Sequence, residues 1–387
     1  MQTLTQSPTD PAFVQNPYRF YDRARQGGDL FHWTDYGKIC AVSHRAVSLI
    51  LRDRRFGREV PADLAPSVPA HLAPFYAIEA HSMLELEPPR HTRLRGLVLR
   101  AFTSRRIAGL EPEIETLSHA LIDRFPDGPF DLLDAFARPL PVIIICRLLG
   151  VPEDRADDLL AWSNAMVAMY QARRTRTIED AATAATIAFR GFLTGYIGAK
   201  RRLPGDDLIS ELIAAEQVGE KLGADELIST CMLLLNAGHE ATVHSLGNGV
   251  KCLIENDTRA IDAGVVEELI RYDPPLHSFS RWAYEDIDVF GQTIPRGSEV
   301  QCLLGAANRD PAAFTDPNRF DPARKGPANT SFGGGIHFCV GAPLARMELL
   351  IALKVLFDRC PRLQIVAPPT YADAYHFHGL ARLMIKN

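Results

Sequence analysis

The sequence lacks the long apolar run that a membrane-spanning helix needs. Of its 387 residues 47% are hydrophobic, yet no segment approaches the ~20 consecutive apolar residues of a bilayer span. Residues 1–17 are polar and contain no apolar stretch of the signal-peptide kind. We therefore expect a cytoplasmic protein that has no membrane partner.

The sequence also lacks a strong excess of charge and any regular cysteine framework. Its formal net charge is -5 and its pI about 6.2, which argues against a general affinity for nucleic acid. The seven cysteines are odd in number, scattered, and form no CxxC pair. This pattern argues against a disulfide scaffold and against a zinc site.

Internal repeats, low-complexity tracts and glycine/serine linkers are missing as well, so we predict one catalytic unit over residues 1–387. Hydrophobic periodicity predicts helix-rich parts at about 89–272 and 341–360. Short β-rich parts are predicted near 30–43, 285–304 and 376–386, the last as a hairpin. The expected fold class is mainly α with a minor β part.

The strongest chemical signal surrounds Cys339, in a segment that reads Phe332-Gly333-Gly334-Gly335-Ile336-His337-Phe338-Cys339-Val340-Gly341. A lone cysteine is usually a small buried hydrophobe. Glycines, however, let the backbone approach a ligand closely, and N–H groups then stabilise a thiolate. The helix predicted to follow adds its positive dipole end. The residues alone leave a metal–thiolate site and a structural cysteine both open.

This segment resembles the cysteine loop of the cytochrome P-450 family, whose pattern Phe-x-x-Gly-x-x-x-Cys-x-Gly is met at every fixed position. The resemblance covers nearly the whole chain, and the family's motifs occur in the expected order. It implies a cytochrome P-450 fold that encloses one haem b (iron protoporphyrin IX). Cys339 would be the axial iron ligand, donating electron density that favours O–O cleavage, and His337 would bind a haem propionate.

Glu268 and Arg271 are three residues apart, which by itself is typical of an exposed helix salt bridge of small energy. In the family a Glu-x-x-Arg pair is structural and is joined by an arginine from the segment before the cysteine loop. Arg319 and Arg324 are both candidates for that arginine. The resemblance thus implies a buried network that serves folding and not catalysis.

His91 and Arg95 are four residues apart and share one face of a predicted helix. A solvated basic face is the default interpretation of such a pair. The soluble bacterial members of the family carry His-x-x-x-Arg here, where it contacts haem propionates, and Arg281 matches a third cationic contact. Arginine suits this task because it binds a carboxylate with two parallel hydrogen bonds.

Residues 232–242 predict an apolar helix interrupted by Gly238 and Glu240. Helix interiors avoid glycine and buried carboxylates unless something compensates. The resemblance implies a long helix over the haem with a local distortion at Ala237-Gly238, where dioxygen sits. It also implies that Glu240 guides protons. In the family, the position after this acid is usually a threonine.

Ala241 stands where the family usually has that threonine, and its side chain cannot hydrogen-bond a water molecule. Three explanations are open. Thr242 supplies the hydroxyl by a local shift, or a substrate hydroxyl holds the missing water, as in macrolide-oxidising relatives with this alanine. The third is a peroxide-driven or otherwise atypical reaction, and we favour the first two.

The reaction implied by the resemblance is monooxygenation, either hydroxylation or epoxidation of a small, apolar organic substrate. Few residues follow Cys339, so we expect electrons from NAD(P)H to arrive through a separate ferredoxin reductase and ferredoxin. Candidates for the docking face are Arg100, Arg105, Arg106 and Arg346. Two alternatives remain: a peroxygenase or oxidative-coupling enzyme, and a non-catalytic haem sensor.

Overall fold

The computed structural model describes residues 1–171, 174–217 and 222–387. Contacts between Cα atoms group the chain into two compact units. Unit 1 consists of Met1–Ala65, His119–Ala137 and Val243–Asn387, and unit 2 consists of Pro66–Ser118 and Arg138–Thr242. Two of the boundaries fall within helices α7 (Glu111–Ile122) and α12 (Ala224–Glu255). The single catalytic unit over residues 1–387 stays a prediction.

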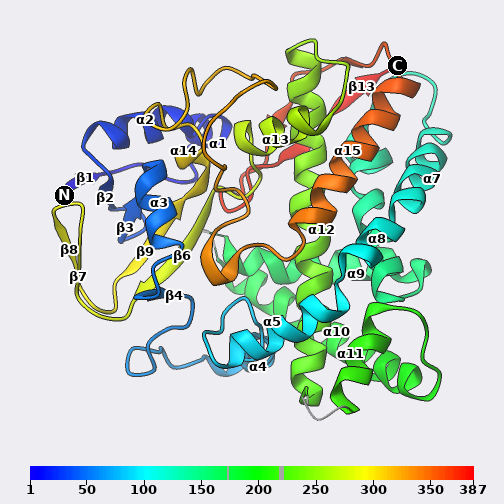
Figure 1. The fold of residues 1–387 in the computed structure, drawn as a ribbon, viewed down its shortest axis with the longest axis horizontal. Helices are drawn as coiled ribbons and strands as arrows, with labels where there is room; N and C mark the ends of the chain where they lie inside the picture. The colour runs from blue at the N-terminus through cyan, green and yellow to red at the C-terminus, as the bar shows by residue number, and fades with distance from the viewer. Residues whose placement is uncertain (172–173, 218–221) are drawn as a thin grey trace. The chain divides into compact units, whose positions relative to one another are not determined.

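All the described strands belong to unit 1. The largest sheet has six strands in the order β1-β2-β3-β9-β6-β4 and is drawn in blue and yellow in Figure 1. The remaining strands form one three-stranded sheet, β10-β13-β5, and the pairs β11-β12 and β7-β8. The strands are β1 (Gln2–Leu4), β2 (Leu30–Trp33), β3 (Lys38–Ala41), β4 (Phe56–Gly57), β5 (Phe130–Asp131), β6 (Ser278–Ala283), β7 (Ile287–Val289), β8 (Gln292–Ile294), β9 (Glu299–Leu303), β10 (Gln364–Ile365), β11 (Thr370–Tyr371), β12 (Leu380–Arg382) and β13 (Met384–Lys386).

The large sheet contains a tight hairpin, formed by β2 and β3. Strands β2 and β3 are joined through Gly37, whose φ of 61° is accessible mainly to glycine. Strand β9 then pairs with β3 in parallel and with β6 in antiparallel orientation. This pairing joins the N-terminal hairpin to the C-terminal half of the chain, and it buries Leu30, Ala41 and Val300 in one apolar cluster.

The helices of unit 1 are α1 (Pro11–Gln15), α2 (Tyr18–Gln26), α3 (His44–Ile50), the π-helix η2 (Leu133–Ala137), α13 (Ala263–Tyr272), α14 (Leu304–Ala307), η5 (Gly335–His337) and α15 (Ala342–Arg359). Side-chain caps start several of them: Ser43 accepts from the N–H of Ala46 at α3, and Asp262 accepts from that of Val265 at α13. Helix α13 packs against α15. This pairing places the Glu-x-x-Arg motif beside the helix that follows the cysteine loop.

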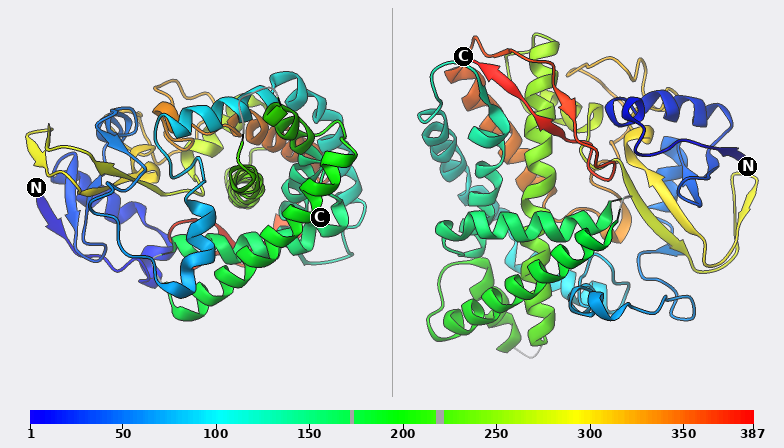
Figure 2. Two further views of the ribbon diagram at one scale, coloured as in Figure 1. Left: turned by 90° about the horizontal axis from the view of Figure 1, so that it is seen from below. Right: turned by 180° about the vertical axis from the view of Figure 1, so that it is seen from behind.

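The helices of unit 2 are η1 (Ala70–Leu72), α4 (Ala73–Glu79), α5 (Arg90–Ala101), α6 (Ser104–Gly109), α8 (Pro139–Leu149), η3 (Glu153–Arg155), α9 (Ala156–Val167), η4 (Ala168–Tyr170), α10 (Arg176–Arg202) and α11 (Leu208–Gln217). Helices α9 and α10 pack along one another, as the rear view in Figure 2 shows. Helix α8 ends at Gly150, which adopts the left-handed conformation (φ 74°) common at helix C-termini.

The C-terminal β-rich part exists, but the predicted hairpin is wrong. Strand β12 pairs with β11, whereas β13 pairs with β10 and β5 in a different sheet. Leu383, between the two strands, is fully buried, and its carbonyl accepts a hydrogen bond from the N–H of Leu132. The two strands therefore join different sheets, β13 with the distant β5, in place of the local turn that the short spacing suggested.

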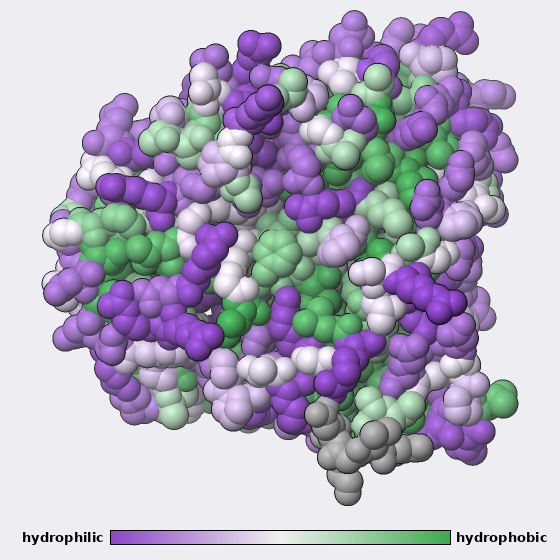
Figure 3. All heavy atoms as spheres, viewed as in Figure 1, coloured by the Kyte–Doolittle hydropathy of each residue, from purple (hydrophilic) through white to green (hydrophobic). Residues whose placement is uncertain are grey.

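Most helices of the described structure lie within 89–272 and 341–360, although α1 to α4 precede the first of these parts. These early helices are short, so their periodicity is weak in the sequence. Within the described residues, no helix combines the length and hydropathy that crossing a bilayer would require. Hydrophilic side chains are spread over the face drawn in Figure 3, with smaller apolar patches between them.

Candidate functional site

The cysteine loop lies in unit 1 and is held by its own backbone. The N–H of Cys339 donates to the carbonyl of Phe332 (3.0 Å), and the N–H of Gly333 donates to that of Thr330 (2.8 Å). These bonds close the loop directly before α15, whose first turn contains Pro343. The thiol of Cys339 is thus presented at a helix N-terminus, as predicted, where the helix dipole favours a thiolate.

Two glycines of this loop have positive φ: Gly333 at 71° and Gly335 at 66°. A Cβ atom at Gly335 would lie 2.5 Å from the carbonyl oxygen of Leu51, a backbone atom that cannot move aside cheaply. A Cβ atom at Gly333 would come no closer than 3.7 Å to its neighbours in the described structure. Glycine at position 335 is therefore required for two reasons: the turn needs a positive φ, and the backbone at Leu51 approaches too closely for a Cβ atom.

Cys339 differs from the other six cysteines of the chain, all of which the structure describes. It is exposed, whereas the others are buried and free of disulfide bonds. Burial raises the pKa of each of these six thiols, to about 12 for Cys146, Cys231, Cys252 and Cys302. Only Cys339 combines an accessible sulfur with surroundings that favour a thiolate, so it is the cysteine that fits a metal ligand.

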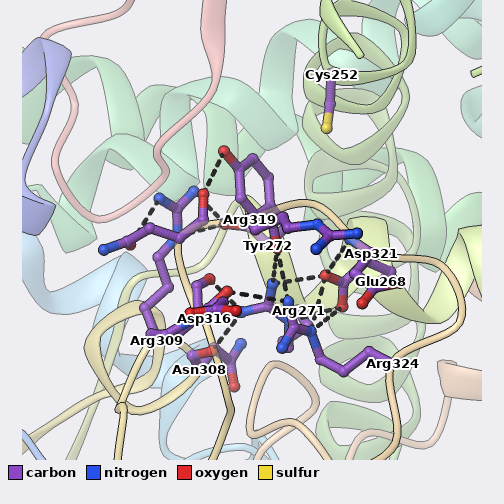
Figure 4. A network of polar contacts seen from close by, with 12 residues as sticks. Cys252, Glu268, Arg271, Tyr272, Asn308, Arg309, Asp316, Arg319, Asp321 and Arg324 are labelled. Atoms are coloured by element: carbon purple, nitrogen blue, oxygen red, sulfur yellow. Dashed lines mark hydrogen bonds and ion pairs between the residues drawn. The ribbon is translucent and has the colours of Figure 1, made fainter. Parts of the chain in front are cut away.

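The Glu-x-x-Arg motif forms a buried ion-pair network, shown in Figure 4. Nε and Nη2 of Arg271 donate to the two carboxylate oxygens of Glu268, both at 2.7 Å, and each side chain is 3% exposed. Nη1 of Arg271 donates to the carbonyls of Asn308 (2.8 Å) and Pro317 (2.9 Å). The pair is therefore a fully hydrogen-bonded structural element and not the exposed salt bridge that spacing alone would suggest.

Of the two candidate arginines, Arg324 joins the network through its side chain. Its Nε lies 3.1 and 3.3 Å from the carboxylate oxygens of Glu268, and its guanidinium also donates to the carbonyls of Thr315 and Arg319. Arg319 has an exposed side chain and contributes only its carbonyl, which accepts from Arg271 as well. The network thus ties α13 to the segment that leads into the cysteine loop.

Two further predicted haem contacts belong to unit 1. Arg281 lies on β6, is 2% exposed, and donates from Nη1 to the carbonyl of Ser280 (3.0 Å). Its guanidinium also lies 5.3 Å from the ring centre of Phe279. His337 is half-buried in the single turn η5. A cation as deeply buried as Arg281 fits an anionic group such as a haem propionate.

The other predicted contacts lie in unit 2. His91 and Arg95 occupy successive turns of α5; His91 is buried and Arg95 half-buried. Both residues lie on one face of α5, as their spacing predicts. That face is not the solvated basic surface that composition alone favours, because His91 is buried and Arg95 half-buried. The helix also carries Arg93, whose guanidinium pairs with Glu226 at the start of α12. That ion pair ties α5 to the helix that contains the predicted oxygen-site residues.

Glu240, Ala241 and Thr242 follow one another on α12, Glu240 and Ala241 half-buried and Thr242 buried. The helix is continuous from Ala224 to Glu255, so the distortion expected at Ala237-Gly238 does not interrupt it. Gly238 has a packing reason instead, because a Cβ atom there would lie 2.8 Å from Cγ1 of Ile145 on α8. Ala237 is exposed, whereas Leu235 and His239 are buried. The exposed side of this turn of α12 therefore carries only a methyl group at position 237.

Sequence reasoning missed a buried polar cluster in unit 1. Asp273, His277 and His378 are buried, and each offers one atom that could bind a metal ion, a carboxylate oxygen or a ring nitrogen. These three atoms lie within 4.8 Å of one another. Tyr371 donates to Asp273, and the Arg309 guanidinium lies 3.6 Å from the ring centre of Tyr18 beside the cluster. This buried positive charge opposes a metal ion there. Only the position of Asp273, directly after the Glu-x-x-Arg helix, could have indicated this cluster from the sequence. His378 lies far from it in the sequence, in the C-terminal tail.

Comparisons with known proteins agree with these observations. The family model described as "Cytochrome P450" matches residues 263–364. "Cytochrome P450 monooxygenase PikC" of Streptomyces venezuelae is 37% identical over 374 residues, 92% of this chain and 87% of that protein. "6-deoxyerythronolide B hydroxylase" of Saccharopolyspora erythraea is 39% identical over 387 residues, 94% of this chain and 93% of that protein.

Solved structures give the same result. The crystal structure of P450BioI in complex with an acyl carrier protein that carries hexadec-9Z-enoic acid has a TM-score of 0.91 and 32% identity, covering 97% of this chain and 99% of that one. The predicted fold class, mainly α with a minor β part, is confirmed. The accessible thiol of Cys339 and the buried cation of Arg281 fit the family's haem b. The chain belongs to the cytochrome P-450 family of haem-thiolate monooxygenases.

Proposed function

We propose that this enzyme hydroxylates or epoxidises a small, apolar organic substrate, with Cys339 as the axial ligand of the haem iron. The observation that carries the proposal is the contrast among the cysteines: only Cys339 is exposed, at the N-terminus of α15, while the other six are buried. Bound haem supplies the splitting of dioxygen and the insertion of one oxygen atom into a C–H or C=C bond.

We assign His91, Arg95, Arg281 and His337 to the two haem propionates. Arg281 and His91 are both 2% exposed; a guanidinium binds a carboxylate with two parallel hydrogen bonds, and an imidazole N–H can donate one. Glu268, Arg271 and Arg324 have the structural role that their hydrogen bonds indicate, to which Arg319 adds its carbonyl. They hold the segment before the cysteine loop and do not contact the substrate.

Glu240 is the group proposed to guide protons, with Ala241 in the place of the family's threonine. Thr242 is the nearest hydroxyl along α12, but it is buried, and consecutive helical residues point about 100° apart. For Thr242 to replace the missing hydroxyl, the helix would have to rotate locally, which the close packing of Gly238 on Ile145 opposes. A hydroxyl on the substrate is therefore the favoured replacement.

The substrate class is supported by the apolar residues of α9 and η4 and by the relatives. Met166 and Met169 are 2% and 6% exposed, which suits a flexible apolar lining as well as ordinary core. One relative is named for the hydroxylation of 6-deoxyerythronolide B. We propose an apolar substrate that carries a hydroxyl near the oxidised carbon, because such a hydroxyl also answers the absence of threonine at position 241.

Electrons are proposed to come from NAD(P)H through a ferredoxin reductase and a ferredoxin. Arg100 and Arg105 are exposed, and Arg100 lines a surface depression of about 490 Å³ that begins at Pro88. Arg106 and Arg346 have side chains that are 17% and 35% exposed and form ion pairs with Glu211 and Glu267. We therefore place Arg100 and Arg105 first among the proposed docking residues, because they are the more exposed. Arg100→Glu with Arg105→Glu should slow reduction by ferredoxin ~10-fold at low ionic strength, and high salt should remove the difference.

The test of the ligand assignment is an absorption spectrum of the reduced protein with carbon monoxide. The wild type should show the strongly red-shifted Soret band of a thiolate ligand, Cys339→Ala should lose it, and the matched control Cys360→Ala should keep it. A Soret band at the position typical of histidine ligation in the wild type would overturn the proposal. Titration of a compound library, followed through loss of the iron-bound water, would then identify the substrate class.

Ala241 also favours a second candidate, a peroxygenase that needs no dioxygen activation. Isotope labelling separates the two, because label from dioxygen appears in the product of a monooxygenase and label from peroxide in that of a peroxygenase. A haem sensor would bind carbon monoxide but would consume no reductant with any compound. We favour monooxygenation because the relatives bear monooxygenase and hydroxylase names.

A further inference from the structure

One turn of α12 places a buried histidine directly against the proposed proton-guiding acid. The side chain of His239 is 3% exposed, and its Nδ1 lies 2.7 Å from the carbonyl oxygen of Leu235, one helical turn earlier. A carbonyl oxygen has no proton to donate, so the hydrogen of this bond belongs to Nδ1. The backbone of α12 therefore fixes the tautomer of His239 and the orientation of its ring.

The other ring nitrogen faces Glu240. Nε2 of His239 lies 3.6 Å from Oε2 of Glu240, whose side chain is 18% exposed. Since Nδ1 already carries its hydrogen, a neutral ring presents a lone pair at Nε2. A lone pair and a carboxylate oxygen repel one another at this distance, whereas one proton between them makes the contact attractive. The geometry thus favours one acid proton held jointly by the two residues.

The surrounding contacts keep this turn in place. Gly238 lets α12 approach Ile145 of α8 so closely that a Cβ atom there would lie 2.8 Å from that side chain. One turn earlier, Nδ2 of Asn236 lies 3.8 Å from the sulfur of Met166 on α9. Ala241, next to the pair, offers no hydroxyl. Among residues 238–242, only His239 and Glu240 have side chains that titrate in the ordinary pH range.

We propose that His239 is a positioning residue that holds a proton jointly with Glu240; the alcohol that Ala241 removes is replaced by the substrate hydroxyl proposed above. This inference rests on the role proposed for Glu240. The loaded pair exists as imidazolium with carboxylate or as imidazole with carboxylic acid; between them the Nε2–H bond breaks and the Oε2–H bond forms. On delivery the Oε2–H bond breaks and the proton passes to an acceptor outside the chain. Neutral imidazole and carboxylate remain, and a proton from water reloads them.

Two substitutions separate this role from a structural one. His239→Asn keeps an amide N–H near the position of Nδ1, so it can still bond to Leu235, but it has no group at Nε2. His239→Gln places its amide near Nε2 but cannot hold an acid proton. Both should keep the thiolate spectrum with carbon monoxide. His119→Gln, on the partly exposed α7 position that contacts Arg359, is the matched control.

The first readout is the ¹⁵N resonances of histidine in the diamagnetic, carbon monoxide-bound protein. His239→Asn assigns the His239 signals among the 12 histidines. We expect a protonated Nδ1 that does not respond to Glu240→Gln and an Nε2 whose shift does. An unprotonated Nδ1, or an Nε2 that is insensitive to Glu240→Gln, would overturn the inference whatever the activity.

The second readout is the fraction of consumed reductant that appears as hydrogen peroxide, measured with a compound found by the spectral titration. Both His239 variants should lower product per reductant ~10-fold and release the difference as peroxide, less than the ~10²–10⁴-fold effect of losing a general acid–base group altogether because Glu240 remains. If Glu240→Gln lowers the product yield and the His239 variants do not, the inference fails while the proposed function stands. If Glu240→Gln has no effect, the role of Glu240 itself fails.

Discussion

Helices α13 and α12 both hold titratable side chains away from solvent, and they treat them differently. On α13, Glu268 receives hydrogen bonds from Arg271, Arg324 and the N–H of Asp321, so both of its oxygens are occupied by donors. On α12, His239 and Glu240 face each other at 3.6 Å with one fixed hydrogen on the far side of the ring. The carboxylate of Glu268 has no proton to exchange, whereas the contact between His239 and Glu240 depends on a shared proton.

The difference shows how similar side chains serve folding in one place and chemistry in another. A buried carboxylate surrounded by fixed donors is stabilised in a single ionised form, so its removal leaves two arginines without their counter-charge. A carboxylate that shares a proton with one imidazole has two protonation arrangements, and the two groups titrate as one pair. The substitutions below test this contrast in order of decreasing effect on stability.

The largest effect is expected at Glu268. Glu268→Gln removes the charge that offsets Arg271 and Arg324, and should lower the free energy of unfolding by about 3–5 kcal/mol. Glu267→Gln is the matched control, because its pair with Arg346 is between one third and one half exposed and should contribute less than about 1 kcal/mol. Urea unfolding of both variants measures the difference, and equal losses would remove the structural role of the network.

Asp273, directly after α13, is intermediate between the two arrangements. Burial alone would raise its pKa, but His378, Tyr371 and the charge of Arg309 outweigh burial and lower that pKa below the usual value. The ionised form therefore stabilises the fold above about pH 4, and this stabilisation is lost as the pH falls through the lowered pKa.

Asp273→Asn should accordingly cost about 1.5–3 kcal/mol at pH 7, the scale of hydrogen bonds to a charged group. The cost should shrink below about pH 4, where the unfolded wild type takes up a proton. Thermal unfolding between pH 3 and pH 8 measures this dependence. A cost that stays constant over the range would show that Asp273 acts by packing alone.

The cysteine loop can be tested with two glycines that share a positive φ but differ in their surroundings. Gly335→Ala should cost about 1–3 kcal/mol because the strained backbone is combined with a clash against the carbonyl of Leu51. Gly333→Ala carries the strain without the clash and should cost less. Haem content and the carbon monoxide spectrum report whether the loop still presents Cys339, and equal losses would contradict the packing role of Gly335.

The smallest change in stability is expected at the α12 turn. Glu240→Gln keeps the shape of a side chain that is 18% exposed, and should alter the free energy of unfolding by less than about 1 kcal/mol. Its effect should appear in the partition of reductant between product and peroxide. A loss of stability comparable to that of Glu268→Gln would show that the carboxylates of Glu240 and Glu268 do not differ in kind.

Much of the fold could be predicted from the sequence because its signals are local. The periodicity of 89–272 and 341–360 predicts helices, and the turn residue Gly37 marks a hairpin. The tail could not be predicted in this way. Strands β12 and β13 are separated by Leu383 alone, yet β12 pairs with β11 while β13 pairs with β10 and the distant β5, and short-range pattern carries no information on the pairing with β5.

The sequence by itself determined the family, the cysteine loop and the residue types of the proposed haem contacts, because these depend on fixed spacing along the chain. Only the tertiary structure decided that Arg324, and not Arg319, reaches Glu268, since both have the same chemistry and only one lies within hydrogen-bond distance. The structure likewise brought Asp273 together with His378, and it turned Nε2 of His239 toward Glu240. Burial and distance decide such contacts, and neither can be read from the order of residues alone.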